Sequence, residues 1–153
     1  PLNPRNVLKG GRTEAFKLYH KCNENERILY YDFTSLYPYV QKYCKYPIGH
    51  PTIITSDFKS IDNYFGFVKC KVLPPKELYF PILPITTDKL VFTLCSTCSS
   101  QKSTVCTHTN DDDRCLIGEW TTIELAEAIA NQYQIIKIFS IYKNHIFVDL
   151  LRN

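Results

Sequence analysis

The sequence predicts an α+β fold, an antiparallel sheet with helices on one side, and three observations support it. Residues 64–73 alternate between apolar and polar side chains, which is the period of a half-buried strand. Residues 121–130 combine a helix-start signal with apolar residues at helical spacing. Residues 134–142 are rich in isoleucine and predict a final strand. Strands and helices therefore succeed one another in no regular order.

Composition places the chain among ordinary folded domains. Hydrophobic residues make up 44% and charged residues 22% of its 153 residues, which excludes a disordered tail. No run approaches the roughly 18–20 apolar residues of a membrane span, so we expect no membrane partner. The chain starts without a signal-peptide core and contains no Met, which favours a piece of a longer polypeptide. The net charge of +3 permits a nucleic-acid partner without requiring one.

Local signals place the elements of the first half. Residues 27–33 form a short β-rich run that ends near Asp32. Pro38 suits the first turn of a helix, because its missing amide hydrogen has no partner there in any case. We expect that helix to stop before Pro47, which cannot continue it.

In the second half, residues 78–88 contain prolines and predict an irregular connection, and residues 90–94 predict a short strand. Thr121 and Glu124 form a capping box that begins a helix, and Asn131 is a plausible helix end. The apolar stripe expected to bury against the sheet consists of Ile123, Ala126, Ile129 and Ala130.

The cysteines predict a metal site. The chain has seven cysteines, and without a secretory signal their clustering favours an intracellular, reducing compartment over a disulfide framework. Cys95 and Cys98 form C-x-x-C, and Cys106 and His108 come after them as C-x-H. Zinc takes four tetrahedral thiolate or imidazole ligands, so these residues predict a Cys₃His zinc knuckle. Cys115 is an alternative fourth ligand or a free thiol, and a flexible loop with reduced thiols is the alternative to a metal site.

The stretch YYDFTSLYP, residues 30–38, carries the chemistry. It places Asp32 at the end of an apolar run, directly before the amides of a helix start and the ring of Tyr37. A carboxylate at a strand end can hold Mg²⁺, and amides at a helix start favour phosphate oxygens. These parts, with a tyrosine to wall off one face of a sugar, predict phosphoryl transfer. The alternative is that Asp32 merely caps the helix near Ser35.

DFTSLYP, residues 32–38, resembles motif A of family B DNA polymerases. The Gly-Gly stretch at residues 10–14 and YPIGHP at residues 46–51 are similar to the protein-primed branch. The Cys/His stretch and the segment after it, up to residue 142, are similar to Maverick/Polinton-type polymerases of transposable elements and viruses. The resemblance implies a partial polymerase palm that performs DNA replication by two-metal nucleotidyl transfer. Its partners would be a DNA template-primer, deoxynucleotides and a terminal (priming) protein.

The resemblance also implies a role for each matching residue. Asp32 would ligate both catalytic Mg²⁺ ions, and the Phe33 carbonyl would complete one metal's shell. The backbone amides of Ser35 and Leu36 would contact the incoming triphosphate. Tyr37 would stack beneath the deoxyribose as the steric gate against ribonucleotides.

A DNA-binding role for Gly10, Gly11 and Arg12 is implied in the same way. They would lie near the template strand, where a bare backbone can approach a phosphate. From the residues alone, the two glycines indicate a simple turn.

The second carboxylate motif of family B, Y-x-D-T-D, and its fingers motif, K-x-x-x-N-S-x-Y-G, do not occur in the sequence. The acidic run at residues 111–113 predicts a solvated loop instead. We therefore expect half of a two-metal site, inactive alone. The expected division is a template-side linker (1–25), a palm segment (26–90) and an insertion resembling the region that contacts the priming protein (91–153). The alternative function is a non-catalytic DNA- or protein-binding module derived from a palm.

Overall fold

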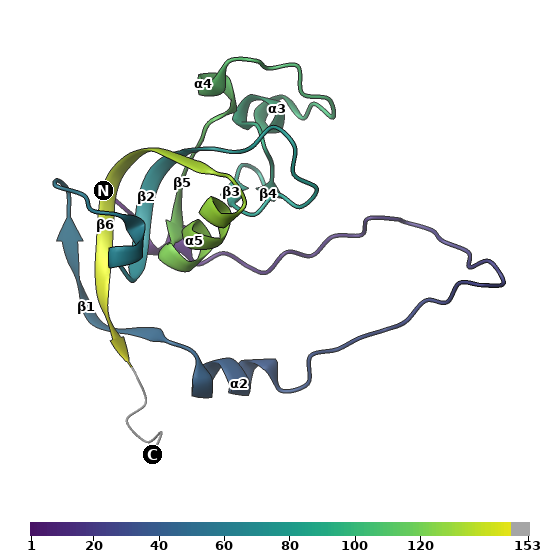
Figure 1. Ribbon diagram of the computed structural model, residues 1–153, viewed down its shortest axis with the longest axis horizontal. Coiled ribbons are helices and arrows are strands. Elements are labelled where there is room, and N and C mark those ends of the chain that lie inside the picture. The colour runs from purple at the N-terminus through teal and green to yellow at the C-terminus, as the bar shows by residue number, and fades with distance from the viewer. Residues whose placement is uncertain (148–153) are drawn as a thin grey trace. The chain divides into compact units, whose positions relative to one another are not determined.

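The structure is a computed structural model that describes residues 1–147. The chain divides into two compact units, which are described separately (Figure 1). The sheet unit comprises residues 1–9 and 47–146, and residues 10–46 belong to the second unit, the motif unit. The predicted insertion, 91–153, extends past the described residues, and the three-part division of the chain stays a prediction.

A four-stranded sheet forms the centre of the sheet unit, with the strand order β1-β6-β2-β5. Strand β2 pairs antiparallel with both β5 and β6. This sheet, together with the helices, confirms the predicted α+β class. The four strands are β1 (Tyr46–Ile54), β2 (Gly66–Leu73), β5 (Leu116–Thr121) and β6 (Gln134–Phe147).

Strand β2 confirms the alternation predicted from the sequence. Val68, Cys70 and Val72 are completely buried, and the residues between them are partly exposed. Trp120 is completely buried in the same core. Its indole Nε1 donates a 2.7 Å hydrogen bond to the carbonyl of Pro84, so the largest core side chain has its polar atom satisfied.

Helix α5 (Thr122–Ala130) begins with the predicted capping box. The Thr121 hydroxyl accepts a hydrogen bond from the Glu124 amide at 3.1 Å, and the Glu124 carboxylate accepts one from the Thr121 amide at 2.8 Å. The helix ends at Asn131 as predicted. The left-handed residue is the next one, Gln132, with φ of 69°.

The predicted buried face of α5 is wrong. Ile123 is 62% exposed and Ile129 is 43% exposed. Six of the nine positions of this helix are apolar and they are spread over more than one side, so the spacing alone admits more than one buried face. Packing against the sheet and the 3₁₀ turn η1 (Ile61–Asn63) selects the face. The buried residues are Thr122, Leu125 and Ala128.

Two segments differ from the sequence prediction. Residues 27–33 form no strand, because no described strand pairs with them and extended backbone needs a neighbour for its hydrogen bonds. Tyr30 in this segment is 93% exposed. Conversely, β1 forms although Pro47 and Pro51 argue against a strand. It lies at the sheet edge, where a missing amide donor is tolerated.

Shorter elements complete the structure. Helix α1 (Pro4–Val7) contacts β5, and Val7 is 1% exposed. Strands β3 (Pro84–Thr86) and β4 (Leu90–Phe92) form a two-stranded sheet. Strand β4 confirms the short strand predicted at residues 90–94, whereas β3 lies within residues 78–88, where an irregular connection was predicted. Among the described residues, no helix has the length and apolar character needed to cross a membrane. The remaining helices are α2 (Leu36–Tyr43), α3 (Ser96–Gln101) and α4 (Asp111–Arg114).

Candidate functional site

Helix α3 orders the first half of the metal loop, defined here as residues 95–115. Cys95 is the N-cap residue of this helix, and its carbonyl accepts the amide of Ser99 at 3.1 Å. Lys102 ends the helix in the left-handed conformation, with φ of 55°. The amide of Ser103 then bonds to the Cys98 carbonyl at 3.0 Å, which closes the turn. This short turn reverses the chain, so that Cys106 and His108 return to the cysteines of α3.

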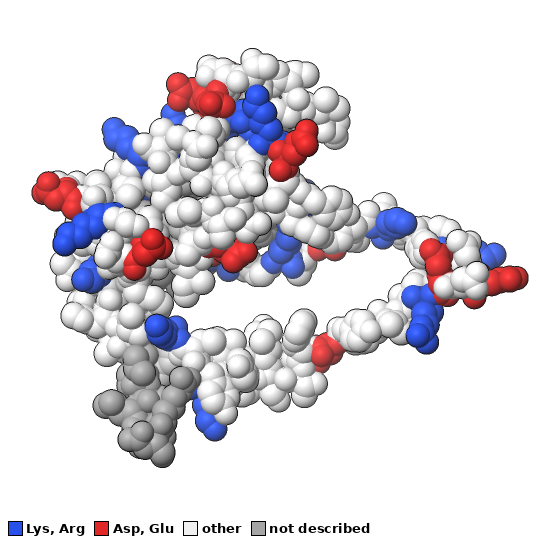
Figure 2. Space-filling view, in the orientation of Figure 1, with Lys and Arg blue, Asp and Glu red and all other residues white. Residues whose placement is uncertain are grey.

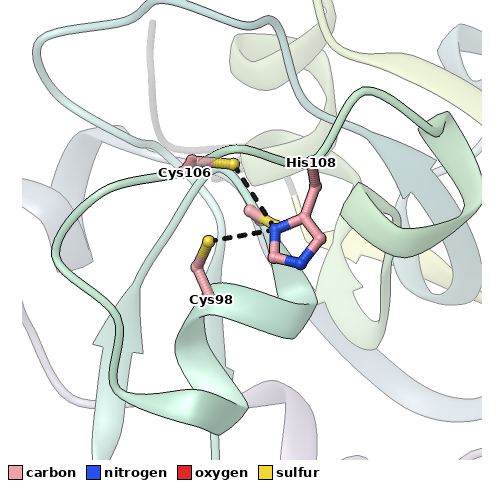
Figure 3. A group of neighbouring side chains, drawn as sticks. Cys98, Cys106 and His108 are labelled. Carbon is pink, nitrogen blue, oxygen red and sulfur yellow. Dashed lines mark hydrogen bonds between the residues drawn. The ribbon is translucent and has the colours of Figure 1, made fainter.

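The Cys/His cluster consists of Cys95, Cys98, Cys106 and His108, whose ligand atoms all lie within 4.8 Å of one another. The imidazole Nδ1 of His108 lies 3.6, 3.3 and 3.8 Å from the three sulfurs, in that order (Figure 3 labels the last two cysteines). Zinc–ligand bonds of about 2.3 Å to sulfur and 2.0–2.1 Å to nitrogen, at tetrahedral angles, imply N···S separations of about 3.6 Å. The three distances from the His108 nitrogen to the sulfurs therefore match those around a tetrahedral zinc ion.

The thiols of the cluster differ in environment. Cys95 and Cys98 are 3% and 7% exposed, whereas Cys106 is exposed. Hydrogen bonds from the backbone and side chain of His108 lower the pKa of Cys106 to about 7. Burial is the main cause that raises the pKa of Cys98, and the neighbouring thiols of Cys106 and Cys95 raise it further. Metal ligation requires the thiolate, the form that the lowered pKa of Cys106 favours.

Cys115, the alternative fourth ligand, lies outside the Cys/His cluster. It is 6% exposed at the end of α4, and burial raises the pKa of its thiol. Because His108 and not Cys115 lies with the other three cysteines, the structure favours His108 as the fourth ligand.

The residues of the DFTSLYP stretch lie in the motif unit, around the start of α2. Ser35 is the N-cap residue, in the left-handed conformation with φ of 58°, and its side chain makes no capping bond. Asp32 is therefore not the cap of this helix. The amide of Leu36 bonds to the Phe33 carbonyl at 3.3 Å. Phe33 and Tyr37 are each 80% exposed, so neither is packed as a core aromatic.

Asp32 belongs to no group of three or more potential metal ligands in the described structure. Within residues 1–147, the Cys/His cluster is the group of three or more His, Cys, Asp or Glu side chains placed to share a metal ion. Asp32 is exposed and outside it. The acidic run, expected as a solvated loop, instead forms the short helix α4, and Asp112 pairs with Lys71 at 2.6 Å.

The Gly-Gly stretch has space around it. A side chain at Gly10 or Gly11 would meet no atom within 4 Å, so no close packing in the structure requires glycine there. The Arg12 guanidinium pairs with Glu14 at 2.7 Å. On the face drawn in Figure 2, basic and acidic side chains are interspersed, and they do not gather into one large basic field.

Sequence reasoning missed Arg114. Its side chain is 4% exposed, and its guanidinium donates to the carbonyls of Pro74 and Pro75 at 2.8 Å each. A charged residue at the end of a polar run gives no sign of burial in the sequence. The two adjacent prolines were the available signal, because they end the strand ladder and leave carbonyls without ladder partners.

Comparisons with known proteins identify the family. A family model described as DNA polymerase type B, organellar and viral, matches residues 3–148. A protein of Neurospora intermedia called "Probable DNA polymerase" is 33% identical over 91 residues, which is 52% of this chain and 9% of that protein. The chain therefore spans a small part of that relative's length. No solved structure matches the chain. The family match covers nearly the whole chain, which therefore belongs to the organellar and viral type B DNA polymerases.

Proposed function

We propose that this chain supplies the first catalytic carboxylate of a protein-primed type B DNA polymerase. The observation that carries the proposal is the family match over residues 3–148, which includes the DFTSLYP stretch. Asp32 and the Phe33 carbonyl would hold Mg²⁺, which stabilises the negative charge that develops during nucleotidyl transfer. Asp32 lies exposed just before α2, so its carboxylate is accessible to an ion and a substrate.

The residues after Asp32 would position the nucleotide. The amides of Ser35 and Leu36 stand at the start of α2, where backbone donors favour phosphate oxygens. The exposed ring of Tyr37 would lie against the deoxyribose and exclude a 2′-hydroxyl by contact. Gly10, Gly11 and Arg12 would lie near the template strand.

A polymerase needs parts that the described residues do not supply. Two-metal phosphoryl transfer requires several ligands to hold both ions, and Asp32 belongs to no group of three or more potential metal ligands among the described residues. We propose that this segment is inactive alone and works with the fingers and second carboxylate motifs of a longer enzyme. A terminal protein would prime that enzyme, and a reducing intracellular compartment would keep its thiols available.

The test is nucleotide incorporation by the polymerase that contains this chain. Asp32→Asn should reduce incorporation by at least ~1000-fold, because a neutral amide holds Mg²⁺ poorly. The metal ion stabilises the charge of the transition state by several kcal/mol, and this stabilisation would be lost. Asp57→Asn is the matched control, since this exposed carboxylate lies in the sheet unit. Near-normal turnover by Asp32→Asn would overturn the motif A assignment and support a non-catalytic binding module instead.

We also propose that the Cys/His cluster holds one structural zinc ion. The metal loop contains mostly hydroxyl, amide and charged side chains, so burial alone cannot order it, and metal binding would supply the missing free energy. Metal analysis of the purified protein should find one zinc that Cys98→Ser removes. Cys44→Ser is the control, because Cys44 is outside the cluster. Equal zinc content in both variants would exclude the site.

A further inference from the structure

The metal loop joins the sheet where the β2–β5 ladder ends. The last pair of that ladder is Val72 with Leu116, and α4 lies directly before β5. Beyond β2 come Pro74 and Pro75, which have no amide hydrogen and cannot extend the ladder. Their carbonyls are left at this end of the sheet and need another donor.

Arg114 supplies that donor. One terminal nitrogen, Nη2, donates to both proline carbonyls at 2.8 Å, and the side chain is only 4% exposed. The Asp111 carboxylate lies 3.5 Å from the other terminal nitrogen. A buried guanidinium is costly unless its donors are satisfied, so these bonds restrict where α4 can lie relative to β2.

The residue before Arg114 connects the same helix to the Cys/His cluster. The carbonyl of Asp113 accepts the Thr97 hydroxyl at 2.8 Å, and the Cys95 sulfur lies 3.8 Å from that oxygen. Thr97 and Cys95 both stand at the start of α3, beside the metal ligands. Figure 1 shows α3 and α4 together beyond the end of the sheet, and the two helices contact each other. Adjacent residues of α4 therefore contact the cluster's helix and the sheet.

We propose that Arg114 is a positioning residue that couples metal binding in the cluster to the order of strands β2 and β5. The inference rests on the zinc site proposed above. Zinc holds the start of α3, Asp113 fixes α4 to it, and Arg114 fixes α4 to the proline carbonyls. Coupling of this kind is reciprocal, so a link that lets zinc stabilise the sheet must also raise the affinity for zinc. The ion pair between Lys71 and Asp112, which is exposed, contributes less.

The test compares the protein with Arg114→Lys and with the control Lys102→Gln. Lysine keeps the charge but replaces the planar fork with a single ammonium. Lys102 lies in the same loop and pairs with Asp88 at 2.9 Å, but both side chains are well exposed, so this pair provides no buried link. The two readouts are the zinc dissociation constant, from competition with a chelating dye, and amide hydrogen exchange of β2 and β5 with and without zinc.

In the unaltered protein and in Lys102→Gln, zinc should slow exchange in the metal loop and also in β2 and β5. In Arg114→Lys, the zinc dissociation constant should rise about tenfold, and zinc should slow exchange in the loop alone. A purely structural Arg114 would destabilise the metal-free and zinc-loaded protein equally and leave the dissociation constant unchanged, which would overturn the proposal. Zinc protection confined to the loop in the unaltered protein would also overturn it, even if Arg114→Lys did not fold. Absence of zinc binding by the unaltered protein would instead overturn the metal centre itself.

Discussion

The metal loop and the DFTSLYP stretch differ in whether the structure gathers potential metal ligands around them. The four candidate zinc ligands come from residues 95–108, and one helix with one turn brings them within 4.8 Å. Asp32 is exposed in a separate unit and belongs to no group of three or more potential metal ligands in the described part of the chain. A structural zinc site can be completed by neighbours in sequence, whereas a two-metal site needs ligands from distant segments.

Burial shows the same difference between the two units. Val68, Trp120 and Leu125 have almost no exposed surface in the sheet unit. In the motif unit, Tyr30 and Tyr37 are 93% and 80% exposed although both are large and partly apolar. Apolar sequence alone therefore does not make a core, because burial requires a surface to pack against.

Zinc removal should produce the largest difference between the two units. Structural zinc in small domains contributes about 10–16 kcal/mol of apparent binding free energy, so a chelator should accelerate amide exchange in residues 95–115 by at least ~100-fold. Exchange in residues 30–38 should not change, because no metal ligand of the cluster lies there. Hydrogen exchange with mass spectrometry measures both segments in one experiment. Equal acceleration in both would contradict the independence of the two regions.

Replacing Tyr37 sharpens the assignment of the motif unit. In the polymerase that contains this chain, Tyr37→Val should relax discrimination against ribonucleotides by up to about 100-fold, because the side chain that meets the 2′-hydroxyl is shortened. Tyr79→Val is a control at another tyrosine that is also 80% exposed. Single-nucleotide incorporation with matched deoxyribonucleotides and ribonucleotides gives the ratio. If Tyr37→Val left the ratio of deoxyribonucleotide to ribonucleotide incorporation unchanged, Tyr37 would not be the steric gate.

Two glycine substitutions compare packing in the two units. A side chain at Gly118 would lie 2.5 Å from the Trp120 ring, so Gly118→Ala should lower the free energy of unfolding by about 1–3 kcal/mol. Gly11→Ala meets no atom within 4 Å and should leave that free energy nearly unchanged. Urea denaturation of both variants provides the measurement. The expectation fails if Gly11→Ala is as destabilising as Gly118→Ala.

Thiol labelling by pH tests the electrostatics of the cluster. The lowered pKa of Cys106, about 7, means that the reactive thiolate appears as pH rises through that value. In metal-free protein, alkylation of Cys106 should be about tenfold faster at pH 8 than at pH 6. Cys70, whose pKa burial raises to about 12, should stay unlabelled in the folded protein. Mass spectrometry of the labelled peptides reports each rate, and added zinc should suppress labelling of Cys106. A flat pH profile would contradict the lowered pKa.

Patterns within a few residues of one another were readable from the sequence. The alternation in β2, the capping box of Thr121 and Glu124, and the C-x-x-C and C-x-H pairs depend on local periods and spacings. The structure confirms the first two and brings the four Cys/His residues together. The DFTSLYP stretch indicated the family through residue identity, and the family match agrees.

Contacts between distant segments could be decided only by the tertiary structure. The sequence predicted the wrong buried face of α5, because apolar residues lie on more than one side of that helix and only packing against the sheet selects among them. It could not show that residues 27–33 lack a strand partner, since pairing depends on another segment. Two adjacent prolines in the sequence indicate carbonyls that need a donor, but only the tertiary structure shows that the buried Arg114 supplies it. Local hydrogen-bonding and metal-ligand patterns are therefore determined by sequence, whereas burial and long-range pairing are determined by what the fold brings alongside.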